Sequence, residues 1–95
     1  MAREMLIWVF AYDIVDDRAR RYVAKTMEAH ATRVQKSVFE GRMSKKKMKA
    51  IVAAIEKHMS RGDSLRVYPI SEKMKKRACL IGGAPLPESE NFWLL

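Results

Sequence analysis

The sequence has few of the residues that signal disulfide frameworks, membrane spans or long loops. Its 95 residues include one cysteine, four glycines and three prolines. A single cysteine excludes an intrachain disulfide, and we expect Cys79, in an apolar stretch, to be a buried packing residue. The longest apolar run is too short to cross a bilayer as a helix, and the N-terminus lacks a secretory signal pattern. We therefore expect a cytoplasmic protein with no membrane association.

Acidic residues are also scarce relative to basic ones. The chain has 11 Asp and Glu against 19 Lys and Arg, a formal net charge of +8 and a pI near 9.9. Such an excess on a small chain favours a polyanionic partner, most often nucleic acid, over a basic protein that is merely soluble. The length predicts a single domain over residues 1–95, with a small core that dimerisation commonly supplements.

One long apolar run is present, and it ends with a carboxylate. Nine of the ten residues of Met5–Ile14 are apolar or aromatic, which predicts a buried central strand. The one charged residue is Asp13, near the end of the run. A carboxylate in such a run is costly unless it lies at a strand end and meets a partner. Asp13 is therefore the first candidate for metal or nucleic-acid chemistry.

Two stretches with helical periodicity follow. Asp16 and Asp17 suit a helix start, because acidic side chains cap free N–H groups and complement the helix dipole. This helix is expected to reach about His30, and a second helix is expected to run from a cap at Ser44 to about Met59. Residues at three- and four-residue spacing define their core faces: Ala19, Tyr22, Val23, Thr26, Met27 and His30, then Met48, Ile51, Val52, Ile55 and Met59.

The remaining segments are extended or irregular. Arg33–Met43 contains strand formers and Gly41 signals a turn or bulge, so we expect two short strands or one bent strand, with no position for the break. A further strand is expected at Ser64–Ile70. The last segments are predicted as a basic connector, a short strand and an apolar tail: Lys73–Arg77, Cys79–Ile81 and residues 84–95, which end in Phe92–Leu95.

This order predicts an α+β fold, a ferredoxin-like βαββαβ sandwich with an extra C-terminal strand. The first strand is apolar on both faces, and helices cover only one side of such a sheet. We therefore expect a second copy of the chain to cover the other side, as a sheet-to-sheet homodimer. The apolar end Phe92–Leu95 is expected to pair with the partner's sheet edge, although it could instead pack on its own sheet.

Four segments resemble the CRISPR-associated protein Cas2 family: Tyr12–Ile14, Arg20-Arg21, Arg33–Gly41 and Asp63–Tyr68. The resemblance covers about Met5 to Gly83. It implies a ferredoxin-like homodimer, metal-dependent cleavage of RNA or DNA, and a place in the complex with the Cas1 integrase that inserts new spacers. Two positions depart from the family, which often has glycine at Ala31 and an aromatic residue at Lys36. We expect neither to touch the site.

Asp13 is the candidate metal ligand and, with Tyr12, the candidate catalytic residue. Phosphodiester hydrolysis needs a cation that stabilises charge and activates water, and Mg²⁺ or Mn²⁺ can be held by one or two carboxylates. A two-fold dimer would bring two copies of Asp13 together, and a cation would relieve their repulsion. The alternative is that Asp13 caps the following helix. Tyr12 could position phosphate or water, or be a core residue with a wet tip.

The resemblance also assigns nucleic-acid contacts. Arg20 and Arg33 match arginines that hold the backbone, for which a guanidinium fork is suited. Ser37 and Phe39 match positions near the cleft, although Phe39 is more often a core strand residue. Lys45, Lys46 and Lys47 oppose the dipole of the helix that they begin, which suggests phosphate contacts, with a solvated basic face as the alternative.

Three functions follow from these features. The first is a metal-dependent nuclease. The second is a non-catalytic scaffold that binds duplex DNA and holds two integrase dimers apart. The third is a toxin-like ribonuclease from a toxin–antitoxin pair. No zinc pattern, phosphate-binding glycine loop or Ser-His-Asp set is present in the sequence to favour another chemistry.

Overall fold

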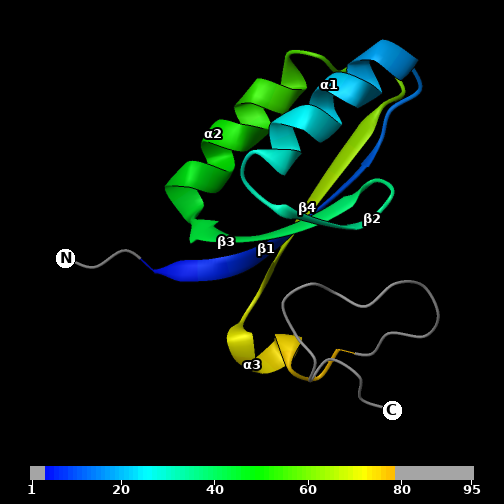
Figure 1. Cartoon of the computed structure of the whole chain (residues 1–95). Helices are drawn as coiled ribbons and strands as arrows, with labels where there is room; N and C mark the ends of the chain where they lie inside the picture. The colour runs from blue at the N-terminus through cyan, green and yellow to red at the C-terminus, as the bar shows by residue number, and fades with distance from the viewer. Residues whose placement is uncertain (1–3, 79–95) are drawn as a thin grey trace.

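The computed structural model describes residues 4–78 and contains one antiparallel sheet of four strands in the order β2-β3-β1-β4. The elements follow the predicted order (Figure 1). Their bounds are β1 Met5–Asp13, α1 Asp17–Glu28, β2 Thr32–Gln35, β3 Val38–Ser44, α2 Lys45–Glu56, β4 Ser64–Ile70 and α3 Glu72–Lys75. The predicted ferredoxin-like α+β fold is confirmed. The predicted strand at Cys79–Ile81 and the tail at Phe92–Leu95 lie outside the described residues.

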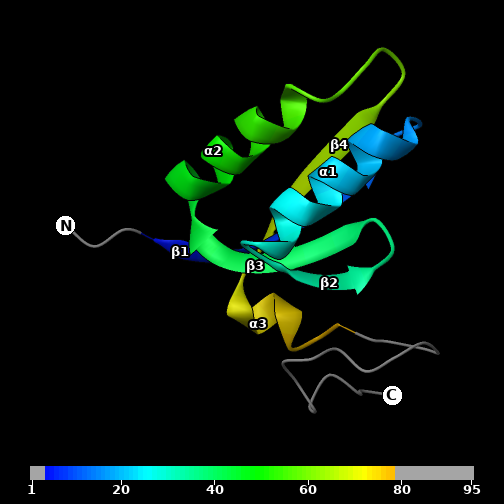
Figure 2. The same cartoon turned by 45° about the horizontal axis from the view of Figure 1, so that its top comes forward.

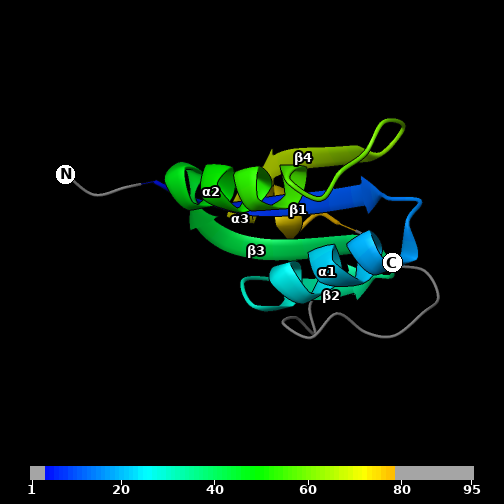
Figure 3. The ribbon, with the colours of Figure 1, turned by 90° about the horizontal axis from the view of Figure 1, so that it is seen from above.

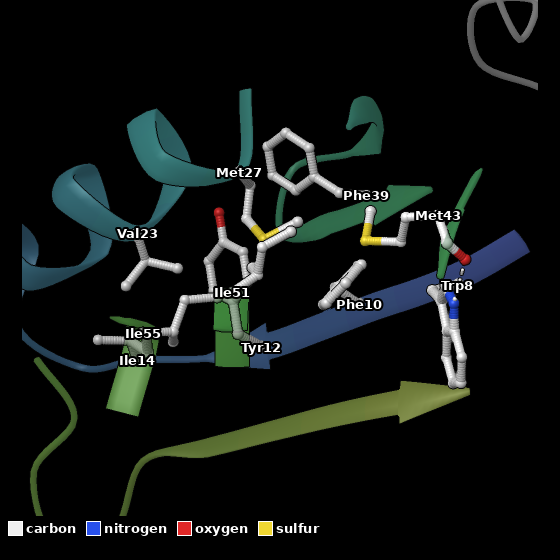
Figure 4. Close-up of a cluster of buried hydrophobic side chains, with 10 residues drawn as sticks. All are labelled: Trp8, Phe10, Tyr12, Ile14, Val23, Met27, Phe39, Met43, Ile51 and Ile55. Carbon is white, nitrogen blue, oxygen red and sulfur yellow. Dashed lines mark hydrogen bonds between the residues drawn. The ribbon is translucent and has the colours of Figure 1, made fainter. Parts of the chain in front are cut away.

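Helices α1 and α2 lie side by side on one face of the sheet and enclose the core (Figures 1 and 3). Alternate residues of β1 point toward them, because successive side chains of a strand point to opposite faces. Figure 4 shows how these side chains interleave with those of the helices. The main buried cluster consists of Trp8, Phe10, Tyr12, Ile14, Val23, Met27, Phe39, Met43, Ile51 and Ile55.

Both long helices begin at the predicted caps. The Asp16 side chain accepts a hydrogen bond from the Ala19 N–H at 2.8 Å, and the Ser44 hydroxyl accepts one from the Lys47 N–H at 3.2 Å. Each helix ends two or three residues earlier than predicted, at Glu28 and Glu56.

The predicted core face of α1 was too wide. Val23 and Met27 are buried, but Tyr22 and His30 are exposed. The Tyr22 ring instead packs on the His58 ring, with 3.7 Å between ring centroids. Only the centre of the predicted apolar stripe, Val23 and Met27, therefore reaches the core.

The region between the two helices is a hairpin of two strands, and its break lies at Lys36-Ser37. Gly41 was predicted as a turn or bulge, and this is wrong, because Gly41 pairs with Trp8 inside β3. A Cβ atom at Gly41 would lie 3.0 Å from the Ala31 Cβ and 2.8 Å from the Met43 methyl. Glycine therefore allows the close packing of the α1–β2 connection on β3, and does not form a turn.

The second face of the sheet is partly covered by α3, which the sequence predicted as a connector (Figures 1 and 2). Glu72 pairs with Arg42, and Lys75 lies 3.4 Å from Glu40. Ile7, beneath this helix, is only 3% exposed. Farther along the same face, Tyr68 is 48% exposed. No helix within residues 4–78 is long and apolar enough to span a membrane.

Candidate nucleic-acid and metal site

Four of the predicted site residues meet at one pocket, at the end of the sheet where β1 finishes. The pocket is open and has a volume of about 140 Å³. Its lining comes from β1, α1 and the β2–β3 hairpin, and consists of Tyr12, Arg20, Arg21, Ala24, Arg33, Lys36 and Ser37. Four of these seven side chains are cationic, so the pocket suits an anion such as a phosphate group.

Contacts around Tyr12, near the end of β1, hold the lining of the pocket together. The Tyr12 backbone N–H donates to the Ser37 carbonyl at 3.0 Å, which fixes the hairpin turn against β1. The Tyr12 and Phe39 rings are stacked with centroids 6.2 Å apart, and the Arg33 guanidinium lies 5.2 Å from the centre of the Phe39 ring. Phe39 is fully buried, so it supports Arg33 from the core and offers no face to a base.

The Tyr12 hydroxyl lies at the base of this cationic pocket. The side chain is 6% exposed and hydrogen-bonds with the Ser37 side chain. Burial raises the pKa of the Tyr12 phenol above its ordinary value, while Arg33, Ser37 and Arg20 act in the opposite direction. The phenol therefore stays protonated at neutral pH and can donate a hydrogen bond to a phosphate oxygen.

Titration of the tyrosines should reveal this burial. Because the folded-state pKa of Tyr12 is raised above the ordinary tyrosine value of 10.0, the neutral phenol favours folding below pH 10. That contribution is lost as the pH rises through the folded pKa. In an absorbance titration, we expect the step that disappears in Tyr12→Phe to lie above pH 10. A missing step at or below pH 10 would contradict the burial of this hydroxyl.

The cations of the pocket differ in how many contacts they make with other groups of the protein. Arg20 donates to the backbone carbonyls of Ile14 and Val15 at 2.9 and 3.2 Å and also pairs with Asp17. Arg33 lies 3.4 Å from Glu28. Arg21 and Lys36 are exposed.

Sequence reasoning missed two of the cationic residues of this lining. Lys36 was expected to lie away from the site, which is wrong, because the tight hairpin places it beside Ser37 at the pocket. Arg21 belonged to a motif of the resemblance but was not singled out. The signal that could have found Lys36 is its place in the two-residue break between strand-forming segments.

Asp13 lies on the opposite face of the sheet from this pocket. It follows Tyr12 directly in β1, so its side chain points away from the helices. Asp13 is exposed and pairs in register with Ser64 of β4. It does not cap α1, because the N-cap is Asp16. Within residues 4–78 its side chain forms no ion pair or hydrogen bond, so the carboxylate is free to bind a cation.

Arg66 is the nearest cationic neighbour of Asp13 by strand register. It pairs with Ala11, which places it on the same face as Asp13 and one diagonal away. Its side chain hydrogen-bonds with Tyr68, which raises the pKa of the Arg66 guanidinium. The lysine cluster 45–47 lies far from both features, because β3 runs from the pocket to the start of α2.

The donor set for a metal is small. No group of three or more His, Cys, Asp or Glu side chains that could hold a metal occurs in the described part of the chain. Asp13 alone fits Mg²⁺ or Mn²⁺ only if the ion keeps most of its waters and takes further oxygens from a phosphate or a second carboxylate. The exposed strand end leaves room for both.

Comparison with known proteins places this arrangement in a family. The family model described as CRISPR associated protein Cas2 matches residues 5–78, which include the pocket and Asp13. The chain belongs to the Cas2 family. This confirms the resemblance drawn from the four sequence segments. Tyr12 and Asp13, on opposite faces of one strand end, both lie within the part of the chain that matches the family model.

Curated relatives of the chain carry names of the same family. The CRISPR-associated endoribonuclease Cas2 3 of Synechocystis sp. is 41% identical over 83 residues, which are 86% of this chain and 90% of that protein. The CRISPR-associated endonuclease Cas2 2 of Thermus thermophilus is 31% identical over 94% of this chain and 96% of its own length.

Two solved structures share the fold. A hypothetical protein from Thermus thermophilus has a TM-score of 0.73 and 28% identity, covering 87% of this chain and 98% of that chain. A chain of a partial Cas6-RT-Cas1–Cas2 complex has a TM-score of 0.66 and 21% identity, covering 88% of this chain and 99% of its own.

Proposed function

We propose that the protein is a divalent-metal-dependent endonuclease of RNA or DNA that acts in CRISPR adaptation, with Asp13 as its metal ligand. The observation that supports this proposal most is the state of Asp13, an exposed carboxylate without a partner within residues 4–78, at the end of a buried strand. One relative is named an endoribonuclease and another an endonuclease, so both substrates are retained.

The metal, Mg²⁺ or Mn²⁺, would neutralise charge on the scissile phosphate and activate water. Asp13 would hold it from the strand end. Arg66, on the same face, is placed to contact a neighbouring phosphate, and its bond with Tyr68 limits the positions of the guanidinium. On the other face, Tyr12, Arg33, Lys36 and Ser37 bind the nucleic-acid backbone.

A homodimer would complete this site. Val9 and Ala11 lie half-buried on the face that α3 leaves uncovered, together with exposed Tyr68. Pairing two such faces would cover this surface and bring the two copies of Asp13 toward the symmetry axis. A single carboxylate per chain then becomes a pair, which is the number that Mg²⁺ commonly takes from a protein.

A second candidate function is a non-catalytic scaffold that binds duplex DNA beside Cas1. It is favoured by the absence of a larger group of metal-binding side chains within residues 4–78 and by the fold shared with a chain of a Cas6-RT-Cas1–Cas2 complex. In this case the basic pocket is the working surface, and Asp13 has no role in chemistry.

Cleavage assays separate the two candidates. Purified protein is incubated with labelled single-stranded RNA and with duplex DNA, with Mg²⁺, with Mn²⁺ or with EDTA. A nuclease cuts at least one substrate internally with a divalent cation and stops in EDTA. If the protein binds duplex DNA equally tightly in EDTA and cleaves no substrate under any condition, the result would favour the scaffold function.

A further inference from the structure

The backbone directly after Asp13 is held by hydrogen bonds from side chains on two sides. Strand β1 ends at Asp13, and α1 begins at Asp17, so Ile14, Val15 and the N-cap Asp16 form the short connection between them. Ile14 is buried and fixes one side of this connection in the core, whereas Val15 is 79% exposed. A connection with so exposed a tip needs polar contacts to hold one conformation.

Arg20 makes the first set of these hydrogen bonds. One terminal nitrogen of its guanidinium, Nη1, donates to both the Ile14 and the Val15 carbonyls, at 2.9 and 3.2 Å. The other, Nη2, pairs with the Asp17 carboxylate. The fork is therefore already occupied by the protein's own oxygens, and only 35% of the side chain is exposed.

Asp63 makes the second contact, from the other side of the connection. Its carboxylate accepts hydrogen bonds from the Val15 N–H at 3.1 Å and from the Ser60 N–H at 2.8 Å. These two bonds lower the pKa of the Asp63 carboxyl, so it remains a charged acceptor at neutral pH. Asp63 directly precedes Ser64, the register partner of Asp13, so this contact ties the start of β4 to the end of β1.

We propose that Arg20 and Asp63 form a bracket around Ile14–Val15 that positions the Asp13 carboxylate for metal binding. Arg20 is then a positioning residue and not primarily a phosphate contact, although it lines the basic pocket. Asp63, 48 positions from Val15 in the sequence, is the second positioning residue. This inference rests on the proposed role of Asp13, and it assigns to Arg20 a function that charge alone would not suggest.

The bracket predicts that two residues of opposite charge behave alike. If Arg20 served only to bind phosphate, Arg20→Gln would weaken nucleic-acid binding, and removing the negative charge in Asp63→Asn would strengthen it. If both position Asp13, either change should loosen the same backbone and weaken metal binding. Arg21→Gln is the matched control, because Arg21 is the next residue of α1 and lies 3.5 Å from the same Asp17 carboxylate.

The test uses the full chain and a readout that does not depend on cleavage. Amide hydrogen exchange at Val15 is measured in EDTA for the wild type, Arg20→Gln, Asp63→Asn and Arg21→Gln. We expect faster exchange in the first two variants, including Arg20→Gln, in which the acceptor of the Val15 N–H is untouched. Exchange within α2 is the internal check that each variant is folded.

The second readout is the Mg²⁺ concentration that gives half-maximal cleavage. Loss of residues that orient a metal ligand typically costs ~10–100-fold in metal affinity, so we expect an increase of about tenfold or more in Arg20→Gln and Asp63→Asn. In EDTA, nucleic-acid affinity should fall no further in Arg20→Gln than in Arg21→Gln. Arg20→Lys should recover part of the Mg²⁺ affinity, because an ammonium can still donate to one of the carbonyls.

Two results would overturn the bracket: wild-type exchange at Val15 in Arg20→Gln, or a loss of nucleic-acid affinity in that variant with an unchanged Mg²⁺ requirement. A failure of the proposed nuclease function can be told apart from both of these results. It would appear as normal cleavage by Asp13→Asn, whereas the exchange rate at Val15 would still decide whether Arg20 and Asp63 hold the connection as one unit.

Discussion

Asp13→Asn should reduce divalent-dependent cleavage by on the order of 10²-fold or more, because it removes the charged ligand that holds the cation at the reacting phosphate. The fold should be unaffected. Asp13 is exposed and does not cap α1, and exposed substitutions without such roles usually change stability by less than about 0.5 kcal/mol. The measurement is the cleavage rate at saturating Mg²⁺, together with the urea midpoint of unfolding.

Asp16→Asn is the matched control for this prediction. It makes the same change of charge three residues along, and asparagine is also a good N-cap, so α1 should remain intact. We expect Asp16→Asn to cleave at close to the wild-type rate. Cleavage by Asp13→Asn at the rate of the Asp16→Asn control would show that Asp13 is not the metal ligand of the nuclease.

Replacing the three pocket cations other than Arg20 should weaken nucleic-acid binding steeply. For duplex DNA, log affinity falls with log salt by ~0.9 per phosphate neutralised. The triple variant Arg21→Gln, Arg33→Gln and Lys36→Gln removes three positive charges from the pocket lining. For each pocket that contacts the duplex, we expect the variant's salt slope to be smaller than that of the wild type by about two to three, with weaker binding to all sequences, because phosphate contacts position without specifying.

The lysine cluster provides a control with an equal change of charge. Lys45, Lys46 and Lys47 are exposed at the start of α2, at the far end of β3 from the pocket. If they also contact phosphates, their replacement by Gln should flatten the slope as well. An unchanged slope in the lysine variant would mean that these lysines form a solvated helix end. An unchanged slope in both variants would show that the net charge does not mark a nucleic-acid surface.

The sequence predicted the framework because that framework depends on local patterns. The long apolar run identified β1 as a buried central strand, and acidic or hydroxyl caps identified where both long helices begin. The alternation of side chains along a strand separates Tyr12 from Asp13. The two were grouped as one catalytic set because they are adjacent in the sequence, yet strand geometry places them on opposite faces of the sheet.

The contacts that were not predicted join residues distant in the sequence. Helix α3 has only four residues, too short for a periodic signal, and it lies against the sheet through pairs such as Arg42–Glu72. Lys36 reaches the pocket because of a hairpin break that propensities did not locate. The contact of Asp63 with Val15 depends on the register of β4 against β1, which no local pattern encodes.

Direct measurement of metal binding tests the central claim most sharply. Mn²⁺ binding is followed by electron paramagnetic resonance in wild type and Asp13→Asn, at protein concentrations where sedimentation shows the oligomeric state. With Asp13 contributed by two copies of the chain, we expect one bound Mn²⁺ per two chains in the wild type and a loss of that site in Asp13→Asn. Equal Mn²⁺ binding by the two proteins would contradict it.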